Sequence, residues 1–389
     1  MSRRKINILY VIDTLFIGGA EKHVVNLCRY INKEKFHTVV CTLFSRDLSK
    51  DEPFAAEIED MGIRVERFGL TSWRDIKVFK KYLNLIEEEN IDIIHAHTTP
   101  ADFWGPLIAR LFKHKKTIVT LHGHDLKKSL ISKIQHSMVN ICLTDKIIAC
   151  SDLLKQFAIH EYFGRPNKIT IIPNMIDTTV FSPENTGYKI RTEYNIPNNS
   201  IVIGSVGRFV KTKAFEISLE IFARVKSQHP KLKFLLCGYG EEEALYRITV
   251  KNLGIENDVI FTGPRTDIDE IMSAIDIVIF TPRYSEGFGI ILIEAMASGK
   301  PVVASNIYPT PDIVKNNVCG FLPFPEDPAI SMDNINIEPF VKKINYLIEN
   351  KSERIRMGLE GRRVAEEKYS TKIVINQIET LYERVSCVN

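Results

Sequence analysis

The stretch IDIVIFTPRYSEGFGIILIEAMASGKPVVA, residues 275–304, decides the fold of the second half of the chain. It reads as a buried strand at 275–280, a glycine-rich turn, a helix at 290–298 that ends at Gly299, and a second buried strand at 301–304. Strands that are apolar throughout and joined by a helix are typical of parallel sheets covered on both faces. The stretch therefore predicts one strand–helix–strand unit of a doubly wound sheet.

The same alternation of apolar runs and helical spacing extends over most of the 389 residues. We therefore expect an α/β chain with two doubly wound parallel sheets. The further predicted strands are 6–12, 37–44, 91–95, 117–121, 146–150, 169–172, 201–206, 232–237 and 258–261. The further predicted helices are 20–31, 74–89, 187–195 and 214–227. In the helix at 74–89, the spacing places on one face Ile76, Phe79, Leu83 and Ile86.

The division between the two sheets is expected where turn-forming residues cluster. Proline, asparagine and glycine gather between Phe181 and Ser200, which predicts domains at 1–185 and 186–368. Residues 323–339 contain prolines and several acidic residues, and this composition favours a loop.

Composition narrows the class of protein. The chain is 44% hydrophobic and 25% charged, with a net charge of +3, so no overall basic character points to nucleic acid. The apolar run at 6–12 is too short for a signal peptide, and no run reaches the length of a membrane span. The seven cysteines form no Cys-x-x-Cys pair, which favours a reducing compartment and a cytoplasmic location.

Two glycine-rich turns are candidate anion sites. Ligands of doubly wound sheets bind at the carboxyl ends of strands, where such a turn opens a helix. Gly18 and Gly19 precede the helix at 20–31, and the run 286–289 precedes the helix at 290–298. Glycines let backbone amides approach an anion, and a helix N-terminus favours negative charge. The alternative for each is a tight turn without a ligand.

Cations and carboxylates accompany these turns. Arg208 and Lys213 stand between a predicted strand and the helix at 214–227, where they would repel the positive helix terminus unless a polyanion is bound. Glu286 lies in the glycine turn, and Glu294 lies about one turn inside the next helix. Two carboxylates beside an anion site suit a polyhydroxylated ligand that carries phosphate. The alternatives are a solvated Glu294 and a capping Glu286.

Together these segments resemble glycosyltransferase family 4 over nearly the whole chain. The most specific match is the E-x7-E pattern of Glu286 and Glu294 within residues 285–303. The other matching segments are Gly18-Gly19-Ala20-Glu21, Leu121-His122-Gly123-His124-Asp125, Pro173-Asn174-Met175-Ile176-Asp177 and Gly207-Arg208 with Lys213. The chain departs from the family pattern at Met175 and Ala214, where the family has glycine, and at 307–312, where it has Gly-Gly-x-x-Glu.

The resemblance implies the GT-B fold, in which two Rossmann-like domains face each other across a cleft. It also implies that residues 369–389 form a helix that returns to the first domain. The implied activity is a retaining, metal-independent hexosyl transfer from a nucleotide-diphosphate sugar, with UDP favoured, to an acceptor hydroxyl. The implied setting is bacterial-type assembly of surface glycans or glycolipids, and the partners would be the nucleotide sugar and a glycan or lipid-linked acceptor. No cofactor is implied.

The resemblance also assigns roles to individual residues. Arg208 and Lys213 would contact the diphosphate, Glu294 the ribose, and Glu286 with the following backbone the donor sugar. The catalytic set would be His122, Arg208, Lys213 and Glu286. The substrate-binding set would be Gly18, Gly19, His97, Gly287, Phe288, Gly289 and Glu294.

Two further signals have plainer interpretations. Asp267-Ile-Asp269 is a literal D-x-D metal motif, but Glu270 follows and the pattern favours a helix start capped by Asp267. Basic residues of the first half could form a surface for anionic lipid at the inner face of a membrane, although a solvated face is the default. These residues, with the adjoining Trp73, are Arg74, Lys77, Lys80, Lys81, Lys113, Lys115, Lys116, Lys127 and Lys128.

Three other functions compete with glycosyl transfer. A dinucleotide-dependent oxidoreductase needs Gly-x-Gly-x-x-Gly after the first strand, which Gly18-Gly19 does not supply. A retaining glycoside hydrolase would use Glu286 and Glu294 about 5 Å apart, and it gives the basic loop no role. A non-catalytic subunit that binds a sugar nucleotide would carry the same binding residues, so this alternative stays open.

Overall fold

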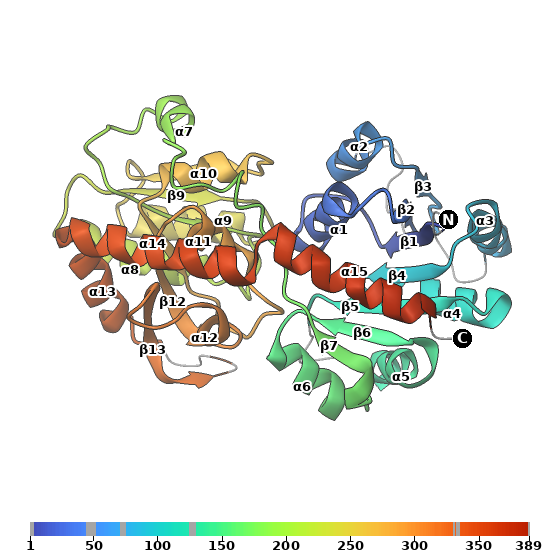
Figure 1. The fold of residues 1–389 in the computed structure, drawn as a ribbon. Coiled ribbons are helices and arrows are strands. Elements are labelled where there is room, and N and C mark those ends of the chain that lie inside the picture. The colour runs from blue at the N-terminus through green and yellow to red at the C-terminus, as the bar shows by residue number, and fades with distance from the viewer. Residues whose placement is uncertain are drawn as a thin grey trace. The chain divides into compact units, whose positions relative to one another are not determined.

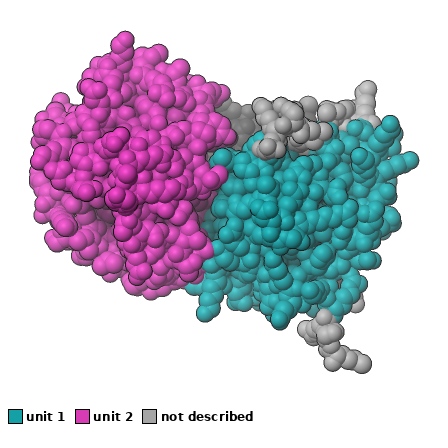
Figure 2. All heavy atoms as spheres, turned by 90° about the horizontal axis from the view of Figure 1, so that it is seen from above, with its two compact units in different colours: residues 1–175, 371–389 teal, residues 176–370 magenta. Residues whose placement is uncertain are grey.

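The computed structural model describes residues 4–43, 52–70, 75–123, 130–329, 331 and 335–387. The chain forms two compact units (Figure 2). Unit 1 comprises residues 1–175 and 371–389, and unit 2 comprises residues 176–370. The sequence placed these divisions after residues 185 and 368.

Unit 1 is built on a parallel sheet with the strand order β3-β2-β1-β4-β5-β6-β7 (Figure 1). Its strands are β1 (Ile6–Ile12), β2 (Phe36–Thr42), β3 (Val65–Arg67), β4 (Ile93–His97), β5 (Lys116–Leu121), β6 (Lys146–Ala149) and β7 (Ile169–Ile171). Its helices are α1 (Gly19–Tyr30), α2 (Pro53–Asp60), α3 (Ile76–Glu88), α4 (Ala101–Lys113), α5 (Leu130–Met138), α6 (Asp152–Glu161) and α15 (Thr371–Cys387).

The core of unit 1 explains why both ends of the chain belong to it. The side chains of Ile8, Tyr10 and Ile12 on β1 pack with buried residues of α1, α2 and α15. Val11 points to the opposite face of the sheet, where α4 packs against β1, β4 and β5. The residues of α15 buried in this core include Val374, Ile378, Leu381 and Val385, which share one helical face.

Unit 2 repeats the plan with the strand order β10-β9-β8-β11-β12-β13, all pairs being parallel. Its strands are β8 (Val202–Val206), β9 (Lys233–Cys237), β10 (Val259–Gly263), β11 (Ile277–Phe280), β12 (Val302–Ile307) and β13 (Gly320–Ala329). Its helices are α7 (Tyr188–Glu193), α8 (Phe215–Lys226), α9 (Glu243–Asn252), α10 (Ile268–Ala274), α11 (Ile290–Ala297), α12 (Thr310–Ile313), α13 (Glu338–Glu349) and α14 (Lys351–Lys368). The prediction of two doubly wound parallel sheets is confirmed.

Two local predictions were wrong. Residues 323–329 are not a loop but part of β13, an edge strand that tolerates its prolines because one side of it needs no ladder partner. In α3 the buried face carries Val78, Tyr82, Leu85 and Ile86, whereas Ile76 is 66% exposed. The three-residue strand β3 also escaped prediction, because it is short and only half-buried.

Each sheet reverses its strand order at one point. In unit 1 the reversal lies between β1 and β4, and in unit 2 it lies between β8 and β11. At such a reversal the connections diverge to opposite faces, which leaves a crevice at the carboxyl ends of the two strands. Gly18 and Gly19 follow β1, and His97 ends β4. In unit 2 Arg208 and Lys213 follow β8, and Glu286 follows β11.

Candidate functional site

The central contact in unit 2 joins the loop after β8 to the loop after β11. Lys213 donates a hydrogen bond from Nζ to Oε2 of Glu286 at 2.7 Å, and both side chains are largely buried. Lys213 Nζ also lies 5.3 Å from the ring centroid of Phe280, the last residue of β11. The other carboxylate oxygen of Glu286, Oε1, is buried and has no hydrogen-bond partner within the described residues. A buried acceptor without a partner suits the hydroxyl group of a ligand.

Arg208, which precedes Lys213 in the same loop, is an exposed cation. Its backbone carbonyl accepts from Val210 N–H at 2.9 Å, and Lys213 N–H donates to the carbonyl of Val210 at 2.9 Å. The loop therefore carries three cations, Arg208, Lys211 and Lys213, between β8 and α8 on a hydrogen-bonded turn. The carboxyl end of a strand and the start of a helix are suited to a bound polyanion.

A glycine loop, Gly238-Tyr239-Gly240, packs against the neighbours of Arg208 and was not predicted from the sequence. A Cβ atom on Gly238 would lie 1.8 Å from the carbonyl oxygen of Gly207, and Phe209 N–H donates to the carbonyl of Tyr239 at 2.7 Å. Gly238 and Gly240 have φ values of 148° and 154°. The signal for this loop was present, since Gly-Tyr-Gly follows the predicted strand at 232–237 and precedes a helical pattern.

The turn from Glu286 to Gly289 opens α11 as predicted. Gly289 occupies the position before the helix with φ 85°, a left-handed conformation that favours glycine. Phe288 is buried, and its ring packs edge-on against that of Tyr369 at 5.8 Å. Glu286 N–H donates to the carbonyl of Tyr308 at 3.3 Å, which ties the turn to the end of β12. Glu294 lies on α11, one turn beyond Gly289.

The departure at position 214 has a structural counterpart. Ala214 precedes α8 with φ 49°, in the left-handed region where glycine is favoured. It is fully buried. The backbone therefore keeps the conformation that glycine would adopt, at some cost in strain.

Unit 1 gathers histidines at its own strand-order reversal. His97 is fully buried, and its Nδ1 lies 3.0 Å from Nε2 of His122, which follows β5. His23, on α1, is also buried, and its ring centroid lies 5.2 Å from that of His122. His95 is held between Tyr382 Oη at 2.6 Å and Thr120 Oγ1 at 2.7 Å.

These histidines are uncharged near neutral pH. Desolvation by burial lowers the pKa of His23 to about 4. Burial also holds the pKa values of His95, His97 and His122 well below the usual range, and the neighbouring histidines lower them further. A neutral imidazole has one hydrogen-bond donor and one acceptor, so the cluster is suited to recognising hydroxyl groups.

Gly18 and Gly19 form the start of α1, within two turns of His23. Gly18 precedes the helix in an extended conformation, and its carbonyl accepts from Lys22 N–H at 3.0 Å. A Cβ atom on Gly18 would lie 2.2 Å from Oε2 of Glu21. The structure therefore brings Gly18, Gly19, His97 and His122 to one edge of the sheet of unit 1.

The remaining candidate residues are separate from both groups. Helix α10 begins after Asp267 as predicted, but the side chain of Asp267 does not cap the helix. Instead Asp267 accepts from Arg265 and Lys189, each at 2.8 Å. Its pKa is held well below the usual range mainly by the hydrogen bond from Arg265. Within the described residues, no group of three or more acidic, histidine or cysteine side chains could hold a metal ion.

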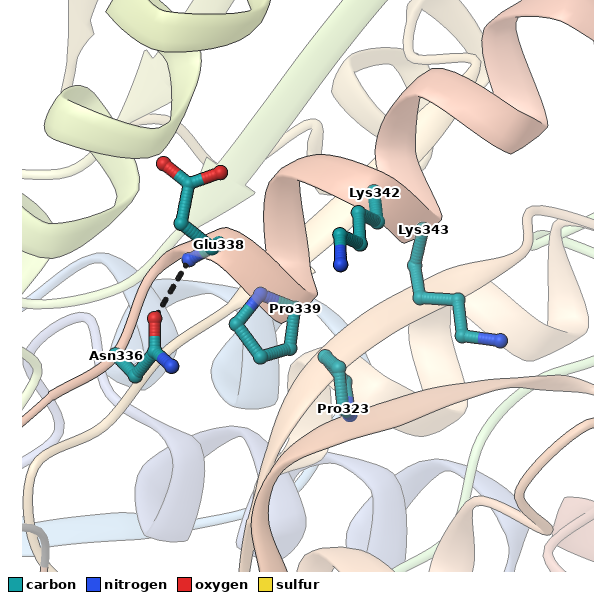
Figure 3. Close-up of a pocket in the computed structure, with 6 residues that line it drawn as sticks. All are labelled: Pro323, Asn336, Glu338, Pro339, Lys342 and Lys343. Carbon is teal, nitrogen blue, oxygen red and sulfur yellow. Dashed lines mark hydrogen bonds between the residues drawn. The ribbon is translucent and has the colours of Figure 1, made fainter.

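A shallow hollow of about 260 Å³ lies elsewhere in unit 2 (Figure 3). In it Glu338 N–H donates to Asn336 Oδ1 at 3.1 Å, and Lys342 and Lys343 line the same hollow from α13. None of the predicted site residues lines it.

Several residues named from the sequence lie outside the described ranges: Trp73, Arg74, His124, Asp125, Lys127 and Lys128. No helix of the described residues combines the length and the apolar character that a membrane crossing requires.

Two family models match the chain. Residues 188–364 match the glycosyl transferases group 1, and residues 17–180 match glycosyltransferase family 4. The chain is 28% identical to the capsular polysaccharide biosynthesis glycosyltransferase CapM of Staphylococcus aureus, over 79% of this chain and 80% of CapM. It is 26% identical to the N-acetyl-alpha-D-glucosaminyl L-malate synthase of Bacillus anthracis, over 79% of this chain and 78% of that enzyme.

Solved structures share the fold. Anabaena Alr3699/HepE in complex with UDP and glucose has a TM-score of 0.83 at 23% identity, covering 97% of this chain and 100% of that one. WaaG, a glycosyltransferase involved in lipopolysaccharide biosynthesis, has a TM-score of 0.71 at 16% identity, covering 95% of this chain and 99% of that one. These similarities, with the two parallel sheets, show the GT-B fold.

Proposed function

The chain belongs to the group 1 glycosyltransferases of family 4, and we propose that it moves a sugar from a UDP-sugar to an acceptor hydroxyl. The observation that carries the proposal is the pair formed by Lys213 and Glu286 at the strand-order reversal of unit 2. The pair places an ammonium group beside a carboxylate oxygen that lacks a partner within the described residues. A donor that carries both a diphosphate and sugar hydroxyls matches the two groups.

The cations act on the leaving group. As the bond between the sugar and the diphosphate breaks, negative charge grows on the diphosphate oxygens. Arg208 and Lys213 stabilise this charge, and the N-terminus of α11 adds its backbone amides. Because these groups supply positive charge, the proposed reaction needs no metal ion. Glu294 holds the ribose hydroxyls, and Glu286 with the backbone of 287–289 holds the sugar.

The histidines of unit 1 serve the sugar and the acceptor in this proposal. His122 is only partly buried, so it is accessible to a ligand, and its neutral ring can exchange hydrogen bonds with a hydroxyl group. His97 is fully buried and bonds His122, so it supports His122 instead of contacting the substrate directly. The amides of Gly18 and Gly19 supply hydrogen-bond donors beside them. Transfer proceeds with retention of the anomeric configuration, as the family resemblance implies.

UDP is proposed as the nucleotide because the structures of the similar HepE contain UDP or UDP-glucose. The acceptor is proposed to be a glycan or a lipid-linked sugar of a bacterial-type surface polymer, since the similar CapM acts in capsular polysaccharide biosynthesis.

A thermal-shift panel of nucleotide sugars, followed by a transfer assay, tests the function. A ligand that binds the native state raises its melting temperature. We expect UDP-sugars to raise the Tm of the wild-type chain and of Lys211→Ala, a matched exposed neighbour, but not that of Arg208→Ala. Binding without hydrolysis or transfer of the sugar would instead indicate a non-catalytic subunit that binds a sugar nucleotide.

We also propose that α3 and α4 contact an anionic membrane surface at the inner face, where a lipid-linked acceptor would lie. Ile76, Leu111 and Phe112 are 66%, 59% and 64% exposed. The exposed Lys77 and Lys80 lie on the same helix as Ile76. Apolar and basic side chains together favour anionic lipid. The wild-type chain should sediment with phosphatidylglycerol vesicles, and a Leu111→Ser, Phe112→Ser variant should not. Equal sedimentation of the wild type and the variant would contradict the membrane contact.

A further inference from the structure

His23 is a buried histidine whose ring nitrogens have no use in the fold. It lies on α1 and is 4% exposed. Neither Nδ1 nor Nε2 has a hydrogen-bond partner within the described residues. Buried polar atoms are rarely left in this state, because the loss of their hydration is not compensated. An apolar ring of the same shape would be more stable at this position.

The rings of His23, His97 and His122 form a nearly regular triangle. Their centroids are 5.2 Å apart for His23 and His122, 5.3 Å for His97 and His122, and 5.8 Å for His23 and His97. Within the triangle, His97 Nδ1 bonds His122 Nε2 at 3.0 Å. The other nitrogen of His97, Nε2, is buried without a partner among the described residues. Three unpartnered nitrogens therefore lie within one cluster of rings.

The direction of the hydrogen bond between His97 and His122 determines whether Nε2 of His97 needs a donor or an acceptor. If His97 donates from Nδ1, its Nε2 is an acceptor and needs a donor. If His122 donates instead, His97 Nε2 carries the hydrogen and needs an acceptor. The neutral ring of His23 offers one donor and one acceptor, and its centroid lies 5.8 Å from that of His97. It can therefore complete either arrangement once the two rings turn toward each other and move slightly closer.

We propose that His23 is a positioning residue for His122, which it orients through a hydrogen-bonded chain from His23 to His97 to His122. The chain fixes which nitrogen of His122 carries the hydrogen, and hence whether His122 donates to or accepts from a substrate hydroxyl. We assign His23 no contact with the substrate, because the residue is 4% exposed, whereas the side chain of Glu286 is 15% exposed. This inference rests on the proposed function, in which His122 serves the sugar or the acceptor.

Three variants separate this role from a structural one. His23→Phe keeps the ring shape and removes both nitrogens, and His23→Gln restores one donor and one acceptor. His95→Phe is the matched control, because the nitrogens of His95 both have partners, Tyr382 and Thr120. We expect His23→Phe to keep or raise the Tm. His95→Phe should lower it, because the buried Thr120 hydroxyl loses its partner His95 and the Tyr382 hydroxyl keeps only its 3.4 Å contact with Tyr10.

The decisive readouts are kinetics and the tautomer of His122. We expect His23→Phe to lower kcat about 10- to 100-fold with little change in the KM for the UDP-sugar. We expect His23→Gln to recover most of this loss. Nitrogen-15 NMR of the histidine rings should show one tautomer of His122 in the wild type and a mixture in His23→Phe.

Two results would overturn the inference. One is wild-type kinetics with a single His122 tautomer in His23→Phe. The other is a loss of Tm in His23→Phe equal to that in His95→Phe, which would show that the nitrogens of His23 serve the fold. A wild-type chain that transfers no sugar would contradict the proposed function alone, since the NMR readout still tests the role of His23.

Discussion

Lys213 and Glu286, 73 residues apart in the chain, form a 2.7 Å hydrogen-bonded ion pair between the loops that follow β8 and β11. The ammonium group of Lys213 is therefore already bound to Glu286 before a sugar donor binds. An incoming diphosphate must therefore share this cation with Glu286, whose second oxygen is available to a sugar hydroxyl. The pair thus couples the proposed diphosphate site to the proposed sugar site.

The first prediction separates the two cations by their effects on stability. Lys213→Ala removes the partner of a largely buried carboxylate, so it should lower the free energy of unfolding of unit 2 by about 1–3 kcal/mol. Arg208 is exposed, so Arg208→Ala should leave stability unchanged. Adding Glu286→Gln to Lys213→Ala should recover much of the loss. Chemical unfolding measures this, and equal stability of both alanine variants would contradict the pairing.

The second prediction concerns the ribose. Glu294→Ala should raise the KM for the UDP-sugar more than it lowers kcat, because ribose contacts are the same in the ground and transition states. The exposed Glu256, changed to alanine, is the matched control. Steady-state kinetics checks this prediction. A fall in kcat with an unchanged KM for the donor would assign Glu294 a different role.

Regular structure could be predicted from the sequence wherever burial was complete. The central strands of both sheets are largely apolar, so the ends of β1, β8 and β11 were predicted to within two residues. The strand β3 is half-buried and β13 is an edge strand rich in proline, so neither carries the apolar run that marks a central strand. The face of α3 was misjudged because Ile76 is apolar but exposed.

The candidate site could be predicted only in part. The residue types and glycine turns around Arg208 and Glu286 signalled an anion site, but the contact of Lys213 with Glu286 depends on β8 and β11 being neighbours in the sheet. His23 escaped prediction because it lies inside a helical pattern and has no motif of its own. Its position beside His122 arises from the packing of α1 against the sheet.

The third prediction concerns acid stability. The pKa of His23 is about 4 in the folded chain and close to 6.5 when unfolded, so the unfolded state binds more protons between these values. Stability therefore falls as the pH drops below 6.5, by about 1.4 kcal/mol per pH unit for each such group. His95, His97 and His122 act in the same direction.

Tryptophan fluorescence measures this effect in unit 1. Trp73 and Trp104 both fall in the sequence of unit 1. Trp104 lies on α4, so the change in its emission follows the unfolding of this unit. We expect a lower unfolding midpoint at pH 5 than at pH 7, and a smaller difference in His23→Phe, which lacks one of the titrating groups. A midpoint that does not change between these pH values would contradict the burial of the histidines as neutral rings.

The fourth prediction concerns metal ions. Two cations and the N-terminus of α11 supply the positive charge that the leaving diphosphate requires, so chelation with EDTA should leave most of the transfer activity. The assay compares chelated enzyme with and without added Mg²⁺ or Mn²⁺. Complete loss of activity in EDTA, restored by either ion, would contradict metal-independent transfer and return attention to Asp267 and Asp269.

The most direct test of the central claim is the release of UDP from a panel of UDP-sugars, with a membrane glycolipid fraction as acceptor. The purified wild-type chain, Arg208→Ala and the control Lys211→Ala are compared at equal folded concentration. We predict that the wild type and Lys211→Ala release UDP from at least one donor with transfer of its sugar, and that Arg208→Ala does so about 100-fold more slowly. Release of UDP from none of the donors by the folded wild-type chain, or equal rates for all three chains, would contradict the account.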